Sequence, residues 1–271
     1  MPQIDPANPS LKSLKGRHLW HAPMSSCSQR VRIVLNETGQ DYDSHLVNLE
    51  KDEHATPEYQ AIHPKGLVPA YVNDGKLFIE SVDIIQQIAG PKSELLSAAD
   101  PQLLEMADEA QTDLKLLTFE FLFRFAGPAP QDKSDAFQAA HQNDVLKQFK
   151  LDFAKGFERE RIDAAVNRTA AGFQHLNDLL ADGRMFLSGN RFSLSDIAWM
   201  PNFHRFQLME WPFERTPNLQ AWFGRVAARD SYQVGLVDWQ PAPLRAEFAK
   251  YVAKRRDEGT DIAQFGVLAA G

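Results

Sequence analysis

The spacing of apolar and polar positions divides the chain into two halves. Between residues 17 and 90 the expected element changes at short intervals. "RHLWHA" (17–22) alternates as a strand does, and "SCSQRVRIVLNETG" (26–39) has the apolar spacing of a helix that stops at a glycine. A second strand, "DYDSHLVNL" (41–49), and a short helical turn, "PEYQAIHP" (57–64), follow. This half therefore begins as βαβα.

A β-hairpin and a helix complete the first half. "LVPAYVND" (67–74) and "KLFIES" (76–81) read as strands, and the Asp74-Gly75 pair between them suits a tight primed turn. Pro69 cannot donate to a ladder, so it must lie at a strand start or on an edge strand. "SVDIIQQIAG" (81–90) then predicts a helix. The expected order is βαβαββα.

The second half has helical spacing from Leu103 to about Phe248. In "FSLSDIAW", Ser193 and Asp196 predict a capping box, a structural role, at the start of a core helix. Residues 1–16 are polar and proline-containing, so we expect a flexible lead-in. Residues 91–102 read as a linker, and residues 103–271 as an all-α domain whose C-terminal extension ends in a mobile tail.

Composition and charge exclude several classes of function. A net charge of -7 and a pI near 5.6 argue against broad binding to nucleic acid or an anionic membrane. The single cysteine excludes an intramolecular disulfide framework, and no apolar run is long enough to span a bilayer. His18, His21 and His63 lack metal-ligand spacing, so we predict no metal site. A cytoplasmic protein is the simplest expectation.

The stretch "APMSSCSQRVRI" (22–33) carries the candidate chemistry. A turn that leads from a strand into a helix gathers free backbone N–H groups and the positive end of the helix dipole, which stabilise an anion. No G-x-S-x-G motif accompanies the serines, so they are poor candidates for nucleophiles. A serine hydroxyl here is better suited to holding the sulfur of another molecule as a thiolate. Arg30 and Arg32 are expected to be solvated or salt-bridged.

Four stretches carry a resemblance to a known family: "SSCSQRVRI", "HPKGLVPAYVNDGKLFIES", "LSGNRFSLSDIAW" and "PNLQAWFGRVAARDSYQ". Together they resemble glutathione transferases over about residues 17–240. The first is similar to the zeta class, which includes maleylacetoacetate isomerase. The resemblance implies a thioredoxin-like glutathione-binding domain at 17–90, an all-α domain with a hydrophobic substrate site at 103–271, and a homodimer.

The resemblance also implies roles for individual residues. Ser25 aligns with the serine that activates glutathione, with Ser26 and Cys27 in support. One serine is expected to cap the helix, and Ser26 is preferred for this. Cys27 is either a small buried residue or a thiol for redox chemistry. The residues implied for glutathione binding are Lys65, Leu67, the Val68–cis-Pro69 pair, Glu80 and Ser81.

The second substrate is expected between the two halves, above the Ser25 turn. The stretches "TFEFLFRF" and "WMPNFHRFQLMEWPF" offer aromatic walls, although each phenylalanine taken alone is more often a core residue. Arg124, His204 and Arg205 could orient a substrate, but a helix-surface histidine is the plainer interpretation of His204. The candidate residues are Phe119, Phe123, Arg124, Trp199, Phe203 and His204.

The expected function is therefore that of a glutathione transferase acting on a small apolar, aromatic electrophile. Conjugation, β-aryl ether cleavage and dehalogenation all remain open, with zeta-type maleylacetoacetate isomerisation as the alternative. The aromatic C-terminal half and the extra tail depart from the zeta pattern and favour an aromatic catabolic enzyme. A non-catalytic ligand-binding protein of the same fold is the rival from another class.

Overall fold

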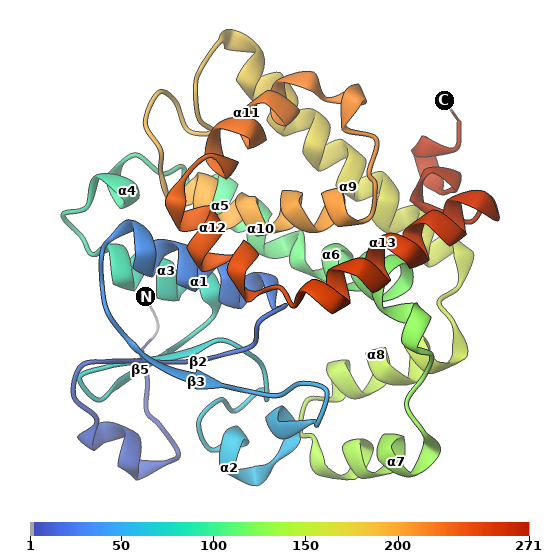
Figure 1. Cartoon of the computed structure of the whole chain (residues 1–271). Coiled ribbons are helices and arrows are strands. Elements are labelled where there is room, and N and C mark those ends of the chain that lie inside the picture. Colours follow the sequence, from blue (N-terminus) through green and yellow to red (C-terminus); the bar gives the residue numbers. More distant parts are fainter. Residues whose placement is uncertain (1–2, 271) are drawn as a thin grey trace.

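The computed structural model describes residues 3–270, and its N-terminal half is built on a five-stranded sheet (Figure 1). The strands run in the order β1-β5-β4-β2-β3, with β2 parallel to β3 and the other pairs antiparallel. The strands are β1 (Gln3–Ile4), β2 (Arg17–His21), β3 (Asp43–Leu46), β4 (Ala70–Asn73) and β5 (Lys76–Ile79). The helices of this half are α1 (Ser26–Glu37), α2 (Pro57–Gln60) and α3 (Ser81–Ala89). The predicted βαβαββα order is confirmed, with one additional strand before it.

The two faces of the sheet bury alternate residues of the same strands. Tyr71 and Phe78 belong to the main core, with α1 and α3 on that side, whereas Ala70 and Val72 pack into a smaller cluster. The predicted turn is present, since Asp74 and Gly75 both have positive φ, at 48° and 78°. Pro69 immediately precedes the interior strand β4, so it lies at a strand start, the first of the two predicted options.

The lead-in is structured in residues 3–16, contrary to the expectation of a flexible segment; residues 1 and 2 lie outside the described part. β1 pairs with β5, and a 3-10 turn at Pro9–Ser13 follows. Leu11 is buried in the smaller cluster beside Val72 and Leu77. A polar, proline-containing segment can therefore be ordered by one strand pairing and one buried leucine, which its average composition does not reveal.

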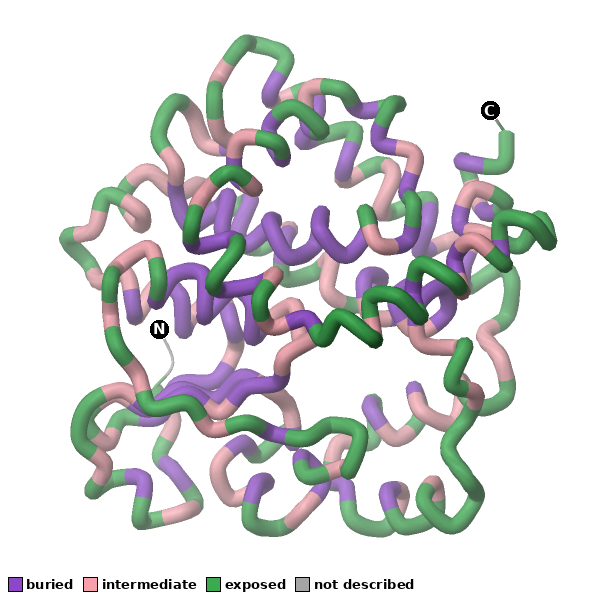
Figure 2. The backbone as a smooth tube through the Cα atoms, viewed as in Figure 1, coloured by how far each residue is buried: buried purple, intermediate pink, exposed green. Residues whose placement is uncertain are grey.

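The second half is helical throughout, as predicted. α10 lies at its centre and is buried on nearly all sides (Figure 2). The capping box is confirmed, because the Asp196 carboxylate accepts from Ser193 N at 2.9 Å. The helices are α4 (Glu94–Ser97), α5 (Pro101–Glu109), α6 (Gln111–Thr118), α7 (Gln131–Ala140), α8 (Asp144–Lys155), α9 (Arg159–Leu179), α10 (Leu194–Leu208), α11 (Pro217–Ala227), α12 (Asp230–Gly235) and α13 (Ala242–Asp257). The expected linker at 91–102 contains α4 and the first turn of α5.

The segment after α13 is packed in its described part, contrary to the expected mobile tail. Two 3-10 turns follow, Ile262–Gln264 and Gly266–Leu268, and the second lies against α9. Ile262 and Leu268 in these turns, and Phe265 between them, are buried. The sequence of this segment did not predict the packing, because single apolar residues hold it in place and they form no periodic pattern. No helix within residues 3–270 is long and apolar enough to cross a membrane.

Candidate active site

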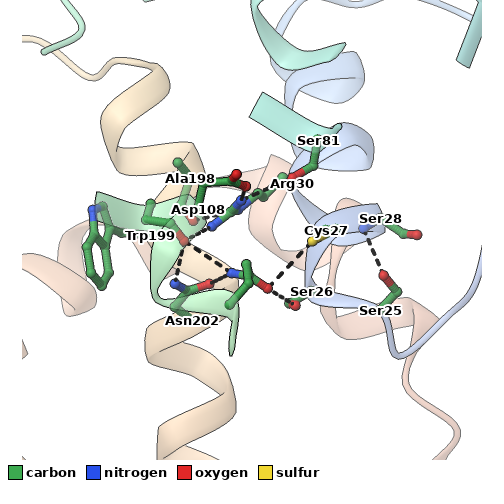
Figure 3. Close-up of polar contacts among 12 residues, drawn as sticks. Ser25, Ser26, Cys27, Ser28, Arg30, Ser81, Asp108, Ala198, Trp199 and Asn202 are labelled. Atoms are coloured by element: carbon green, nitrogen blue, oxygen red, sulfur yellow. Dashed lines mark hydrogen bonds and ion pairs between the residues drawn. The ribbon is translucent and has the colours of Figure 1, made fainter. Parts of the chain in front are cut away.

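The serine that caps α1 is not the one that was expected. Ser25, not Ser26, is the N-cap of α1, and its Oγ accepts a hydrogen bond from Ser28 N at 3.2 Å (Figure 3). A hydroxyl has one proton to donate and two lone pairs to accept with. Capping uses only a lone pair, so the Ser25 proton remains available to a ligand at the N-terminus of α1. The Ser25 side chain is also partly exposed.

The hydroxyl of Ser26 is hydrogen-bonded to the helical half. It donates to Gln111 Oε1 at 2.6 Å, and the Cys27 thiol points to the same oxygen at 3.5 Å. The Gln111 amide in turn donates to Asn202 Oδ1 on α10 at 2.6 Å. In Figure 3 the interactions of Ser26 and Cys27 run towards the helices of the second half, whereas that of Ser25 stays within α1. Gln111 and Asn202 belong to no recognisable motif, so the sequence analysis missed them.

The two arginines that follow are fully buried and not solvated, and Arg30 forms a salt bridge, the other form expected. Arg30 donates to the carbonyls of Ala107 and Ala198 and to Ser81 Oγ at 2.5, 2.9 and 3.0 Å, with Asp108 at 3.3 Å. It thus joins α1 to α3, α5 and α10.

Arg32 donates to the carbonyls of Gly235 and Pro23 and to His21 Nδ1. Burial, with the nearby Arg32 cation, lowers the pKa of His21 to about 3. Arg205 of α10 donates to the Met24 carbonyl and so holds the turn before Ser25 from the other side. These guanidinium groups connect the two halves around the site.

The predicted glutathione-binding loop has the backbone form that the resemblance implies. The Val68–Pro69 peptide bond is cis, and the Leu67 carbonyl accepts from the Tyr59 hydroxyl at 2.6 Å. Lys65 is exposed and pairs with Glu80 at 2.5 Å. The structure thus brings Lys65 to Glu80, the residue that precedes α3.

The start of α3 is left open for a ligand. Glu80 is its N-cap, with φ of 69°, but no side chain bonds to the first N–H groups of the helix. A non-glycine residue held at positive φ marks a constrained position. Ser81 is buried, and its Oγ accepts from Arg30, which leaves its proton to donate. Uncapped N–H groups at a helix start favour an anion, such as a carboxylate.

A cleft of about 690 Å³ continues from this helix start between α3 and α5. Its polar lining is mostly acidic, and burial, with the carboxylates of Glu80 and Asp108 nearby, raises the pKa of Asp83. The lining includes Lys65, Glu80, Asp83, Gln86, Glu105 and Asp108. An acidic cleft beside an uncapped helix start suits a ligand that carries both an ammonium and a carboxylate group.

A hairpin of α7 and α8 supports the Lys65–Leu67 loop from the helical half. His141 Nε2 contacts the Gly66 carbonyl at 3.2 Å, and Asn143 donates to the Lys65 carbonyl at 3.2 Å. Phe137 packs with Ala55 and Leu67. The hairpin therefore positions backbone on the glutathione side, a function that no sequence signal indicated.

The residues proposed for the second substrate divide into two groups. Phe119 and Phe123 are partly exposed and in edge contact at 5.2 Å between ring centroids, so they remain candidates. Trp199 is buried and donates to the Leu103 carbonyl, and Phe203 is stacked between Phe213 and Phe223. These last two are core residues, because α10 is covered on all sides.

Arg124 and His204 are also engaged within the fold. Arg124 is partly exposed and pairs with Glu120 at 2.6 Å. His204 is buried between the Tyr232 hydroxyl and the Gln240 amide, each at 2.6 Å, so it is not a surface histidine. Burial lowers its pKa to about 4. Within residues 3–270, no group of three or more His, Cys, Asp or Glu side chains is placed to hold a metal ion.

Comparisons with known proteins agree with this architecture. The family model "Glutathione S-transferase, N-terminal domain" matches residues 19–93, and "Glutathione S-transferase, C-terminal domain" matches residues 159–225. Tetrachloro-p-hydroquinone reductive dehalogenase of Sphingobium chlorophenolicum is 25% identical over 81% of this chain and 95% of its own. Maleylacetoacetate isomerase of Pseudomonas aeruginosa is 46% identical, over 28% of this chain and 38% of its own.

Among solved structures, a beta-etherase from Sphingobium sp. strain SYK-6 has a similar fold. Its TM-score is 0.69 at 20% identity, over 81% of this chain and 98% of the etherase. The two family models match parts of both halves of the chain, and the first match includes the Ser25 turn. The predicted resemblance is confirmed, and the chain belongs to the glutathione S-transferase family, whose members use glutathione as co-substrate.

Proposed function

We propose that Ser25 activates glutathione by donating its hydroxyl proton to the sulfur, which is then held as a thiolate at the N-terminus of α1. The supporting observation is that Ser25 caps α1 through a lone pair, while the Ser26 proton is committed to Gln111. A charge-assisted hydrogen bond contributes about 1.5–3 kcal/mol, and one pKa unit requires about 1.4 kcal/mol. The thiol pKa can thus be lowered by one to two units, towards neutral pH.

The rest of glutathione is proposed to lie along the first half. The backbone of Val68 pairs with the cysteinyl part, and the uncapped start of α3, with the Ser81 hydroxyl, receives the γ-glutamyl carboxylate. The Glu80 carboxylate receives the γ-glutamyl ammonium. Lys65 is left for the glycyl carboxylate, because its pair with Glu80 is exposed and costs little to break.

The thiolate then attacks an electrophilic carbon of an aromatic substrate. A C–S bond forms, and the leaving group, a halide or an aryloxide, departs with the electron pair of the bond that breaks. Proximity and the pre-formed thiolate account for the rate, without a covalent intermediate on the enzyme. The relatives include a reductive dehalogenase and an isomerase, and a solved structure of similar fold is an etherase, so these reactions are the ones to test first.

Cys27 supports a second candidate, a reductive step. Its thiol lies in the same turn as Ser25 and is partly exposed. Cys27 as thiolate attacks the sulfur of an aryl–glutathione conjugate, forming a mixed disulfide while the aryl carbon leaves with the electron pair and takes a proton. A second glutathione thiolate then releases oxidised glutathione and restores Cys27. Two glutathione molecules supply the two electrons.

Calorimetry with glutathione tests the binding side of the proposal. We expect saturable binding by the wild-type chain and about tenfold weaker binding by Glu80→Gln, which loses one charge-assisted contact. Lys133→Gln, an exposed substitution on α7, is the matched control and should bind as the wild type does. Absence of any heat, and of retention on immobilised glutathione, would favour the non-catalytic ligand-binding protein.

A substrate panel tests the reaction class. Chlorinated hydroquinones, β-aryl ethers and a maleylacetoacetate-like diketo acid are each assayed with glutathione, and the product identifies dehalogenation, ether cleavage or isomerisation. We expect turnover of an aromatic substrate. Turnover of the diketo acid alone would favour the zeta-type isomerase.

We also propose that the chain works as a cytoplasmic homodimer, as glutathione transferases typically do. Light scattering at micromolar concentration tests the assembly, and a monomer mass would contradict it.

A further inference from the structure

Lys115 is a half-buried lysine that the proposed function does not yet use. It lies on α6, one helical turn after Gln111 on the same face. Gln111 is the residue that accepts from Ser26 and Cys27. Residues four apart on a helix have Cβ atoms about 5–6 Å apart, so Lys115 lies next to Gln111, the residue that joins α6 to the start of α1.

Aromatic rings line the side chain of Lys115. Its ammonium lies 4.3 Å from the centroid of the Phe149 ring on α8. The next position on the same face of the helix is Phe119, whose ring is 5.0 Å from Phe149. Figure 1 shows α6 above α8, with the α1 region close by. A cation thus lies among rings that could stack with an aromatic substrate.

Among the described residues, the ammonium of Lys115 has no carboxylate partner. Within residues 3–270 it forms no hydrogen bond or ion pair. Nearby acids along the chain are already paired. Asp113 of α6 is bidentate with Arg168, and Glu120, just after α6, pairs with Arg124 and Arg255. Asp52, near α8, pairs with Lys150 at 2.5 Å.

Burying part of a cation without a partner costs free energy of solvation, and an anionic ligand would offset that cost. Burial, together with the Lys150 ammonium, lowers the pKa of Lys115 to about 8, while Cys27 opposes this shift. His54 is the other nearby titratable group, and burial lowers its pKa to about 4, which keeps it neutral near pH 7. An anion at Lys115 would therefore meet one unpaired positive charge.

We propose that Lys115 is the anion-binding residue of the second-substrate site, and that the aromatic electrophile carries an anionic oxygen, a carboxylate or a phenolate. This inference rests on the proposed function, since it assigns the substrate class of the same site. The ammonium holds the anionic oxygen, Phe119 and Phe149 contact the ring, and the electrophilic carbon is presented to the sulfur at Ser25. Lys115 is thus a specificity-determining residue.

Paired substrates test this assignment. Chlorodinitrobenzene is neutral, and chlorodinitrobenzoate carries a carboxylate, but both lose chloride to a thiolate by the same reaction. For Lys115→Met we expect kcat/KM with chlorodinitrobenzoate to fall about tenfold or more, while kcat/KM with chlorodinitrobenzene changes less than about threefold. Lys115→Arg should keep most of the preference for chlorodinitrobenzoate over chlorodinitrobenzene. Lys133→Met, an exposed substitution on α7, is the control and should change neither substrate.

Direct binding separates the possible sources of the anion. Benzoate, nitrophenolate and the neutral benzamide are titrated calorimetrically without glutathione. The wild type should prefer at least one anion over benzamide, and whichever anion Lys115→Met binds less well identifies a carboxylate or a phenolate. Benzoate affinity should fall as pH rises through about 8 in the wild type and stay constant in Lys115→Arg, because arginine remains charged.

The outcomes distinguish this inference from the proposed function. Suppose the wild type binds glutathione and turns over chlorodinitrobenzene. If Lys115→Met then lowers kcat/KM for both substrates equally, or for neither, the anion site is wrong and the proposed function stands. If the wild type binds neither benzoate nor nitrophenolate better than benzamide, the anion site is also wrong. If glutathione does not bind, the proposed function itself fails.

Discussion

The two sides of the Ser25 turn are built in different ways. On the glutathione side, a few side chains act together with backbone groups: the start of α1, the Val68–Pro69 peptide and the uncapped start of α3. On the helical side they are single side chains, such as Gln111 and Lys115 on α6. Backbone groups keep their positions when side chains change. We infer that substrate choice on the helical side can change while glutathione binding is retained.

The largest expected effect tests the connection between the two sides. Arg30→Met removes the buried guanidinium that joins the carbonyls of Ala107 and Ala198, and it takes the ion-pair partner from Asp108. We expect the free energy of unfolding to fall by about 3–5 kcal/mol, measured by urea denaturation. Arg191→Met is the control, because Arg191 is exposed and its ion pair is long, at 4.0 Å, and it should change stability by less than about 0.5 kcal/mol. Equal losses in both variants would contradict the role of Arg30.

The next effect tests the glutathione side alone. Ser25→Ala removes the hydrogen bond to the thiolate, so kcat/KM should fall about tenfold to a hundredfold, and the thiolate absorbance of bound glutathione near neutral pH should disappear. Ser26→Ala should keep that absorbance, because the Ser26 proton is directed to Gln111. If Ser26→Ala loses the thiolate and Ser25→Ala keeps it, the two roles are the reverse of those proposed.

A smaller effect tests whether histidines in the two halves lower the stability equally as the pH decreases. Burial lowers the pKa of His63 in the first half and of His204 in the second to about 4. Between that value and 6.5 the unfolded chain binds protons that the folded chain does not, so stability falls as pH decreases below 6.5. At pH 5 each histidine should cost about 2 kcal/mol.

Urea denaturation at pH 7 and pH 5 measures this loss. His63→Asn and His204→Asn should each show a shallower decline than the wild type, by similar amounts. A decline unchanged in both variants would show that other groups control the acid response.

The smallest expected effect concerns the thiol at the boundary between the two sides. Cys27→Ala should leave conjugation within about twofold, because Ser25 and the α1 cap do not depend on the thiol. It should abolish a reductive step, which needs the mixed disulfide. Product analysis by mass spectrometry measures both. Equal loss of all activities would assign Cys27 to thiolate activation.

The difference between the glutathione side and the helical side explains which parts of the site were predictable from sequence. The roles proposed for Ser25, Glu80 and Ser81 came from the resemblance to glutathione transferases, which short motifs carry because the residues of a strand, turn and helix start are close in the chain. Gln111 and Lys115 were missed because a glutamine and a lysine in a polar helical stretch have no distinguishing pattern. Arg30 has the ion pair that was one of its two expected forms, but the burial of Arg30 and Arg32 was missed for a related reason: partners such as Ala198 and Gly235 are remote in sequence.

The sequence by itself determined the βαβαββα order, the hairpin turn at Asp74-Gly75 and the capping box at Ser193, since each depends on backbone preferences of neighbouring residues. It also determined the family, through the resemblance of four short motifs. Tertiary structure alone decided which serine caps α1 and which donates to Gln111, that Trp199 and Phe203 are core, and that residues 3–16 and the segment after α13 are packed. The physical reason is that these outcomes depend on which distant groups satisfy each buried donor, acceptor and apolar surface. Such partners are chosen only when the chain is folded.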